Sequence, residues 1–146
     1  MLLKIMMSPA GLAFDRFMVR WTGISPLCRV FARMSGFPPQ PPLLLTVKGR
    51  KSGRPRASVL PYFEIDGRMF VVGSRGGGPI DPQWVTNLRA EPNCTIVVGR
   101  KTRKVTARIA GGNERQGLWH DLVKQVPTYA HYQTLTTREI PLVIFD

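Results

Sequence analysis

The first third of the chain repeats apolar residues at helical spacing, with basic residues between them. Apolar side chains recur mostly three or four positions apart over residues 12–34, and the arginines that interrupt them are Arg16, Arg20, Arg29 and Arg33. This pattern predicts an amphipathic helical segment over residues 1–38, broken or kinked near Gly23 and Pro26. Two interpretations fit it equally: a helix that lies at a membrane interface, and a helix that packs against its own domain.

A different pattern follows a stiff, proline-rich linker at residues 36–42. Short apolar runs there are typical of strands. They predict strands over residues 43–47, 57–65, 68–74, 95–98, 104–109 and 140–145. Asp66 and Gly67 separate two of these runs, as in a two-residue hairpin turn.

Two short helices are predicted between the strands. One spans residues 82–89 behind Asp81 as N-cap, and the other spans residues 113–126 with Asn113 as cap. Six strands in meandering order with two helices favour a mainly β fold with α elements (α+β), built as a small antiparallel barrel. The sequence therefore predicts an N-terminal amphipathic helical segment, residues 1–38, and a barrel domain, residues 39–146.

The net charge of the chain indicates which kinds of ligand it attracts. Twenty-one Lys and Arg against nine Asp and Glu give the 146-residue chain a net charge of +12. Such a field attracts nucleic acid, anionic lipid or a phosphorylated small molecule. Two cysteines and two histidines in unrelated contexts predict no metal site, and Cys28 and Cys94 fit small buried residues in a reducing compartment.

No apolar stretch approaches the roughly 20 residues of a membrane span, and the N-terminus lacks a clear signal peptide. We therefore expect a cytoplasmic protein. If residues 1–38 lie at a membrane interface, the protein would also be attached peripherally to the inner face of the cell membrane.

The segment Gly49-Arg50-Lys51-Ser52-Gly53-Arg54-Pro55-Arg56 places four cations and a hydroxyl between two predicted strands. Glycine lets backbone N–H groups approach an anion, and arginine pairs with phosphate oxygens in a bidentate manner. The segment lacks Walker A spacing. A solvated basic hairpin tip is the alternative, and charge alone also allows nucleic acid.

A glycine run at residues 72–78 ends the next hairpin without Rossmann spacing. It suits a loop close to a flat or charged ligand, beside the positive N-terminus of the helix predicted at residues 82–89. We expect its amides to converge with the cations of residues 49–56 on one phosphate. Ser74, His120 and Asp121 do not make a hydrolase triad, because adjacent residues of a helix point to different faces. Residues 127–133 fit a ligand-covering loop or aromatic packing.

Together these segments resemble the deazaflavin-dependent nitroreductase family, small reductases that use coenzyme F420, a phosphate-bearing 8-hydroxy-5-deazaflavin. The matching stretches are LLLT at 43–46, GRKSGRPR at 49–56, VGSRGG at 72–77, Pro82-x-Trp84-x-x-Asn87-Leu88, Pro127-x-Tyr129-x-x-Tyr132 and Arg138-x-Ile140-Pro141. They run in order over about residues 40–146. The resemblance implies a split β-barrel, FMN-binding-like fold.

The resemblance also implies roles. The phosphate and acidic tail of the cofactor would be held by Arg50, Lys51, Ser52 and Arg56. Its body would contact Ala57, Ser58, Val59, Leu60, Pro61, Val72, Gly73, Ser74, Arg75, Gln83, Trp84, Val85, Thr86 and Asn87, with Tyr129 closing over the ring. The catalytic candidates are Ser74, Tyr129 and Tyr132; Ser74 and Tyr132 would face the acceptor. Pro61 and Val126 stand where nitroimidazole-activating relatives carry aromatic hydroxyls, which puts that activity in doubt.

The expected reaction is hydride transfer from reduced F420 to a quinone, nitro or other conjugated apolar acceptor. One alternative is an FMN-dependent reductase with the same barrel. The other is a non-catalytic basic module that binds nucleic acid or anionic membrane, although no nucleic-acid motif is present and we expect no such partner.

Overall fold

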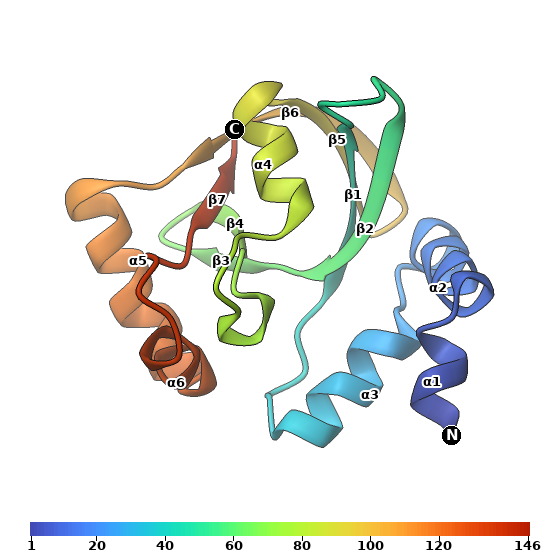
Figure 1. Cartoon of the computed structure of the whole chain (residues 1–146), viewed down its shortest axis with the longest axis horizontal. Coiled ribbons are helices and arrows are strands. Elements are labelled where there is room, and N and C mark those ends of the chain that lie inside the picture. Colours follow the sequence, from blue (N-terminus) through green and yellow to red (C-terminus); the bar gives the residue numbers. More distant parts are fainter.

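A single curled antiparallel sheet forms the body of the protein (Figure 1), in a computed structural model that describes all residues 1–146. Its strands are β1 (Pro42–Lys48), β2 (Pro55–Pro61), β3 (Phe63–Ile65), β4 (Arg68–Val72), β5 (Asn93–Val98), β6 (Lys101–Ile109) and β7 (Leu142–Phe145). They are ordered β2-β1-β5-β6-β7-β4-β3. Every neighbouring pair is antiparallel, as predicted, but the order is not a simple meander.

The barrel curls because its two edge strands are halves of one bent segment. β2 and β3 lie at opposite ends of the strand order, yet only Tyr62 separates them in the chain. The first half pairs with β1 and the second half pairs with β4. The single strand predicted at residues 57–65 thus changes partners at Tyr62, whose N–H donates to the Pro41 carbonyl at 3.1 Å.

Two tight turns set the register of the hairpins. Asp66 and Gly67 have φ of 52° and 72°, the left-handed pair that a type I′ turn requires, and this predicted hairpin is confirmed. Gly99 and Arg100 have φ of 53° and 68° and join β5 to β6 in the same way. The loop expected over residues 99–103 was therefore too long, since β6 begins at Lys101.

The N-terminal segment is three helices, α1 (Leu2–Met6), α2 (Pro9–Thr22) and α3 (Pro26–Ser35). α2 ends at Gly23, a left-handed C-cap with φ of 74°. Ser25 caps α3 through its side chain, with Pro26 in the first turn. The remaining helices are α4 (Gln83–Ala90), α5 (Gly112–Gln125), α6 (Thr128–Thr134) and the 3₁₀ turn η1 (Arg75–Gly77). None of the helices combines the length and apolar character that a membrane crossing requires.

Two details of the predicted helices are wrong. α4 is capped by Pro82 rather than Asp81, and Asn113 lies inside α5, whose N-cap is Gly111. Asp81 instead accepts charge-assisted hydrogen bonds from Arg89 and Arg138, which are stronger than a bond from a neutral amide. Residues 127–133, for which a ligand-covering loop and aromatic packing were both open, are mostly the helix α6, and Tyr129 packs there against Phe37 and Phe63.

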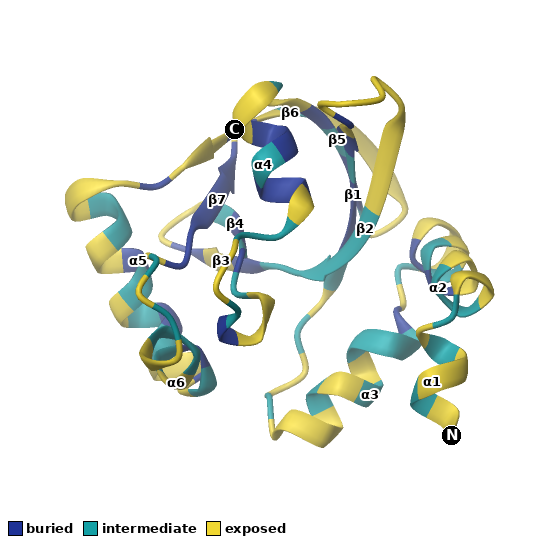
Figure 2. Cartoon of the chain, viewed as in Figure 1, coloured by how far each residue is buried: buried dark blue, intermediate teal, exposed yellow.

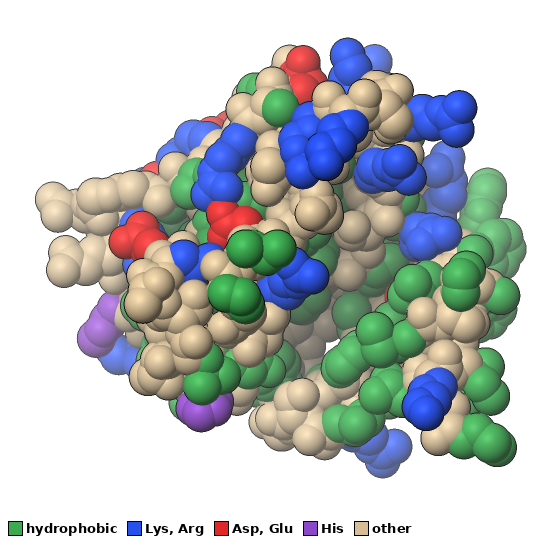
Figure 3. Space-filling model, in the orientation of Figure 1, with side chains coloured by type: hydrophobic (Ala, Val, Ile, Leu, Met, Phe, Trp, Pro, Cys, Tyr) green, Lys and Arg blue, Asp and Glu red, His purple; other side chains and the backbone are tan.

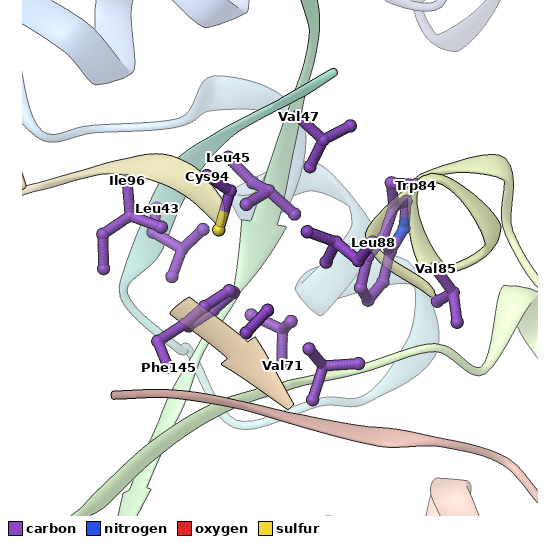
Figure 4. Packing of buried hydrophobic residues seen from close by; sticks show 12 residues of the cluster. Leu43, Leu45, Val47, Val71, Trp84, Val85, Leu88, Cys94, Ile96 and Phe145 are labelled. Atoms are coloured by element: carbon purple, nitrogen blue, oxygen red, sulfur yellow. The ribbon is translucent and has the colours of Figure 1, made fainter. Parts of the chain in front are cut away.

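The core has one main cluster inside the barrel and two satellites outside it (Figures 2 and 4). Inside, Trp84, Val85 and Leu88 of α4 pack on residues of the strands, so that α4 is fixed to the barrel. α5 and α6 cover a second cluster that contains Phe70 and Tyr129. Val19 of α2, only 1% exposed, packs with Leu44 and Val97 in the third.

Candidate active site: two cavities beside the edge strand

A basic cavity of about 680 Å³ opens between the β1–β2 turn, α4 and α2. It is lined by Arg16, Gly49, Arg50, Lys51, Ser52, Pro55, Arg56, Ala57, Ser58, Gln83, Trp84 and Asn87. The space-filling view shows Lys and Arg side chains gathered over this end of the molecule (Figure 3). The lining holds four cations and no carboxylate.

Arg50 is held in place by α4. Its guanidinium donates to Gln83 Oε1 at 2.8 Å and to Asn87 Oδ1 at 2.9 Å. These acceptors are neutral amides, so they orient the guanidinium without neutralising it. None of the six ion pairs of the chain uses a cation of this cavity. The cavity is therefore an uncompensated positive site, with the donor set that phosphate and carboxylate groups need.

The turn that carries these cations is closed by its own hydrogen bonds. The Gly49 N–H donates to the Arg54 carbonyl and the Gly53 N–H to the Gly49 carbonyl, both at 2.8 Å. Gly53 has φ of 71°, a conformation that glycine adopts without strain. The hydroxyl of Ser52 accepts from the Arg54 N–H at 3.2 Å. These bonds give Arg50, Lys51 and Arg56 a defined platform.

An apolar cavity of about 180 Å³ lies between the N-terminal helices and the barrel. It is lined by Asp15, Leu27, Cys28, Phe31, Ala32, Phe37, Pro38, Gln40, Val59, Pro61, Phe63 and Tyr129. Tyr129 is 3% exposed, and its hydroxyl takes part in no side-chain hydrogen bond of the chain. Burial raises the pKa of Tyr129, and Tyr132 and Cys28 raise it further. Tyr129 thus presents a neutral hydroxyl donor in an apolar wall.

The edge strand β2 borders both cavities. Ala57 and Ser58 line the basic cavity, and Val59 and Pro61 line the apolar one. Leu60 instead packs against the barrel core. Because β2 ends the strand order and pairs only with β1, backbone N–H and C=O groups along its other edge have no strand partner. A ligand lying along this edge could reach from the cations to the apolar cavity.

The glycine run lines neither cavity, so the expected convergence of its amides with the cations is not observed. The N–H groups of Gly73, Gly77 and Gly78 donate to the carbonyls of Pro141, Ser74 and Arg75. Arg138 donates to the carbonyls of Gly73, Ser74 and Gly78, which fixes the loop. The N–H groups of these three glycines are thus already bonded within the chain.

The other residues that were expected to contact the cofactor line neither cavity. Val72 and Val85 pack into the two large core clusters, and Thr86 is half-buried outside both cavities. Arg75 is exposed, whereas Ser74 is half-buried directly before η1, which contacts α6. The rings of Tyr129 and Tyr132 are 6.1 Å apart at their centroids. The three catalytic candidates therefore lie on two elements that touch.

Comparison with known proteins identifies the family. The profile described as F420H(2)-dependent quinone reductase matches residues 29–146. An F420H(2)-dependent quinone reductase of Mycobacterium tuberculosis is 35% identical over 119 residues, which cover 80% of this chain and 78% of the relative. The chain belongs to this family.

Two solved structures agree with this assignment. One, an F420-H2 dependent reductase (FDR-A), is 39% identical and superimposes with a TM-score of 0.64 over 72% of this chain and 93% of its own. The other, described as a domain-swapped dimer, is 36% identical with a TM-score of 0.65 over 81% and 92%. The predicted split-barrel, FMN-binding-like fold is confirmed.

Membership in the F420H(2)-dependent quinone reductase family decides between the alternatives that the sequence left open. The chain is an oxidoreductase rather than a non-catalytic basic module, and the cofactor of its family is F420 rather than FMN. The residues present fit that cofactor. The basic cavity offers uncompensated cations to a phosphate-bearing molecule, and its volume lies within the usual range of about 300–1,000 Å³ for ligand pockets.

The sequence of this reductase did not indicate that α2 lines both cavities and α3 the apolar one. Arg16 was expected only among the basic residues of the amphipathic segment, and no site role was expected for Asp15, Leu27 or Phe31. One signal was available. Asp15 is the only acid among the first 63 residues and shares a helical face with Val19, four positions later. A carboxylate on an apolar face indicates a buried partner.

Proposed function

We propose that this chain transfers a hydride from reduced F420 to a quinone, or to a related conjugated apolar acceptor. The proposal rests on one observation: an uncompensated cationic cavity and an apolar cavity with a tyrosine hydroxyl that makes no hydrogen bond in the chain border the same edge strand. The cationic cavity suits an anionic redox cofactor, and the apolar cavity with its hydroxyl suits an apolar acceptor.

The basic cavity holds the phosphate and acidic tail of the cofactor. Arg50, Lys51 and Arg56 bind the anionic oxygens, and Ser52 adds a hydroxyl. Arg50 is already oriented by Gln83 and Asn87, so little side-chain entropy is lost when the anion binds. The body of the cofactor extends along the open edge of residues 57–61 towards Tyr129.

The protein orients the reactants and stabilises charge on the acceptor. When bound, reduced F420 supplies the hydride. The Tyr129 hydroxyl donates a hydrogen bond to the acceptor oxygen on which negative charge develops. Its raised pKa keeps that hydroxyl protonated even in the range in which an ordinary tyrosine begins to ionise. Tyr132 and Ser74, on the adjoining elements, are the further candidates for orienting the acceptor or returning a proton.

The size of the apolar cavity favours a ring as acceptor. An apolar cavity of about 150 Å³ is known to take a benzene molecule, and this one is about 180 Å³. A quinone ring therefore fits inside, and a long apolar tail has to extend beyond it. Pro61 contributes no hydroxyl to the wall, and Val126 is buried in the second core cluster. The wall therefore lacks the aromatic hydroxyl that nitroimidazole-activating relatives carry at position 61, which argues against nitroimidazoles as acceptors.

Residues 1–38 attach the protein to a membrane surface, where apolar quinones reside. Their outer face exposes large apolar side chains, including Trp21 at 60%, Phe17 at 56% and Met34 at 65%. Figure 3 shows such side chains gathered over α1, α2 and α3. Arg20 lies beside Trp21 and the turn residues Arg100 and Lys101, so cations accompany this face. Aromatic and basic residues together are typical of interfacial helices.

A binding titration followed by a reoxidation assay tests the reaction. The protein should quench F420 fluorescence at micromolar concentration, and menadione should then reoxidise bound F420H2. Arg56→Gln should weaken binding about tenfold, the loss of one charge-assisted hydrogen bond. Arg54→Gln is the matched control, because Arg54 lies in the same turn but outside the cavity. Absence of quenching would refute the proposal.

Flotation with liposomes tests the membrane attachment separately. The full-length protein should float with vesicles that contain anionic lipid, and Trp21→Ser with Phe17→Ser should reduce the floating fraction. Failure of the full-length protein to float would end this part of the proposal without affecting the reductase assignment.

A further inference from the structure

Two consecutive residues of α2 reach the two cavities. Arg16 lines the basic cavity, and Asp15 lines the apolar one. Val19, three positions after Arg16 and four after Asp15, lies on the same helical face. That face is the one that packs on the barrel, through contacts of Val19 with Leu44 and Val97. α2 is therefore a shared wall of both cavities.

Asp15 fixes the position of α3. It is 3% exposed, and its carboxylate accepts from the Ser25 hydroxyl at 2.8 and 3.0 Å and from the Leu27 N–H at 2.9 Å. The Ser25 hydroxyl in turn accepts from the Cys28 N–H at 2.9 Å. The first turn of α3 is thus held by a buried carboxylate of α2. Since α3 supplies Leu27, Cys28 and Phe31 to the apolar cavity, the Asp15 bonds set its outer wall.

Arg16 carries a positive charge into a cavity whose other charged residues are also positive. It shares the basic cavity with Arg50, Lys51 and Arg56, and no carboxylate pairs with it. Like charges in one cavity oppose the docking of α2. Only three buried residues and the half-buried Val59 make up the cluster that holds α2 on the barrel. An anion in the cavity would convert this repulsion into attraction.

We propose that Arg16 is a further ligand of the cofactor's anionic part, and that its binding fixes α2 and, through Asp15, the α3 wall of the acceptor cavity. The acceptor cavity is then complete only when the cofactor is bound, which makes cofactor binding precede acceptor binding. This inference rests on the proposed function, since it assigns the anion to the cofactor and the apolar cavity to the acceptor.

Cofactor affinity and hydrogen exchange of the full-length protein test the role of Arg16 without turnover. Arg16→Gln should raise the Kd for F420 about tenfold, the effect of one charge-assisted hydrogen bond. Arg20→Gln is the matched control, one turn further along α2 and outside the basic cavity. F420 should slow amide exchange in α2 and α3 at least about fivefold in wild type. Arg16→Gln at saturating F420 should lose this protection, and Arg16→Lys should restore part of it.

The variant Asp15→Asn tests whether Asp15 couples α2 to α3, separately from the binding of the cofactor by Arg16. This variant should bind F420 with a Kd within about twofold of wild type, because Asp15 does not line the basic cavity. Its α3 amides should nevertheless exchange rapidly with F420 bound, and KM for menadione should rise. Ser25→Ala, which removes one partner of the carboxylate, should show the same change to a smaller extent.

The outcomes distinguish this inference from the proposed function. If wild type does not bind F420, the proposed function fails. If wild type binds F420 but α2 and α3 gain no protection, or if Arg16→Gln behaves like Arg20→Gln, the coupling is refuted and the proposed function stands. Equal protection of α3 by F420 in wild type and in Asp15→Asn would refute the role of Asp15.

Discussion

The side-chain oxygen of Asn87 accepts two hydrogen bonds from Arg50, one from its backbone N–H at 3.1 Å and one from its guanidinium at 2.9 Å. Asn87 is 5% exposed and belongs to α4, whereas Arg50 belongs to the β1–β2 turn, 37 positions earlier. This contact joins the basic turn to the helix that fills the barrel. It also aims a cation into the basic cavity before any ligand arrives.

Asn87→Ala should therefore weaken F420 binding more than it disturbs the fold. Arg50 keeps only its bond to Gln83, and its guanidinium gains rotational freedom that binding must remove. We expect a Kd about tenfold higher by fluorescence titration, with circular dichroism unchanged. Asn93→Ala is the control, because Asn93 accepts a hydrogen bond from exposed Thr106 on the far strands. An unchanged Kd for Asn87→Ala would contradict the positioning role.

Local patterns were sufficient to predict most of the strands, because their apolar residues come in short runs bounded by turn residues. The Asp66-Gly67 turn was equally clear, since both residues favour left-handed φ. β6 was harder. Its first three residues, Lys101, Thr102 and Arg103, are exposed and polar, so no apolar run marks them and they were assigned to the turn before the predicted strand 104–109. α6 was missed because its helix forms to bury Tyr129 rather than from strong helix propensity.

The residues of the candidate site divide in the same way. Local sequence identifies some of them, and the packing of distant elements brings the others into the site. Composition alone located the cations of residues 49–56, since four of them occur in eight residues. The contribution of Arg16 depends on how α2 packs on the barrel, which no local pattern specifies. The glycine run was over-interpreted. The amides of Gly73, Gly77 and Gly78 are bonded within the chain, and three carbonyls of the loop are held by Arg138, which lies 60 or more positions away.

Arg138 should prove important for stability. Its side chain is 14% exposed and donates to the carbonyls of Gly73, Ser74 and Gly78 and to Asp81. Arg138→Ala leaves the carbonyls of Gly73 and Gly78 without this donor and removes one of the two donors to Asp81 and to the Ser74 carbonyl. It should lower the free energy of unfolding by about 2–4 kcal/mol. Arg89→Ala is a matched control, because Arg89 pairs with the same Asp81 but is 48% exposed. Urea unfolding should show a loss of about 0–1 kcal/mol for the control. Equal losses of stability in the two variants would contradict the role assigned to Arg138.

Stability should depend on pH through Glu114. Hydrogen bonds from Arg108, and then from Arg68, lower the pKa of Glu114 from its ordinary 4.5 to about 2. A carboxyl whose pKa is depressed on folding stabilises the protein above its unfolded pKa, and the contribution is lost as pH falls through the folded value. The stability difference between wild type and Glu114→Gln should therefore be full at pH 7 and shrink between about pH 4.5 and 2.

Urea midpoints at pH 7, 4 and 3 would measure this difference. Asp121→Asn serves as the control, because Asp121 takes part in none of the ion pairs. A difference for Glu114→Gln that stays constant from pH 7 to pH 3 would contradict the assignment.

Filling the apolar cavity should block the acceptor and spare the cofactor. Ala32 lies on α3 and lines that cavity, so Ala32→Phe would occupy much of its 180 Å³. We expect KM for menadione to rise at least about tenfold, while the Kd for F420 stays within about twofold. Ser35→Phe is the control, at an exposed position of the same helix outside the cavity. If both variants reduce menadione as wild type does, the acceptor binds elsewhere.

Tyr129→Phe should separate catalysis from stability. The hydroxyl makes no hydrogen bond within the chain, so its removal should change the free energy of unfolding by less than about 0.5 kcal/mol. If the hydroxyl stabilises charge on the acceptor, kcat/KM for menadione should fall about 100-fold, as for loss of an oxyanion donor. F420 affinity should persist because the ring remains.

The same hydroxyl also predicts the pH profile. Burial, with Tyr132 and Cys28 adding to it, raises the pKa of Tyr129 above its ordinary 10.0, so the donor stays protonated through the range in which an ordinary tyrosine begins to ionise. Wild-type kcat/KM should consequently show no decline from this group between about pH 7 and 10. Tyr62→Phe is the control, because Tyr62 lies outside both cavities. Wild-type kcat/KM in Tyr129→Phe would exclude the hydroxyl from the reaction, and the choice would then lie between Tyr132 and Ser74.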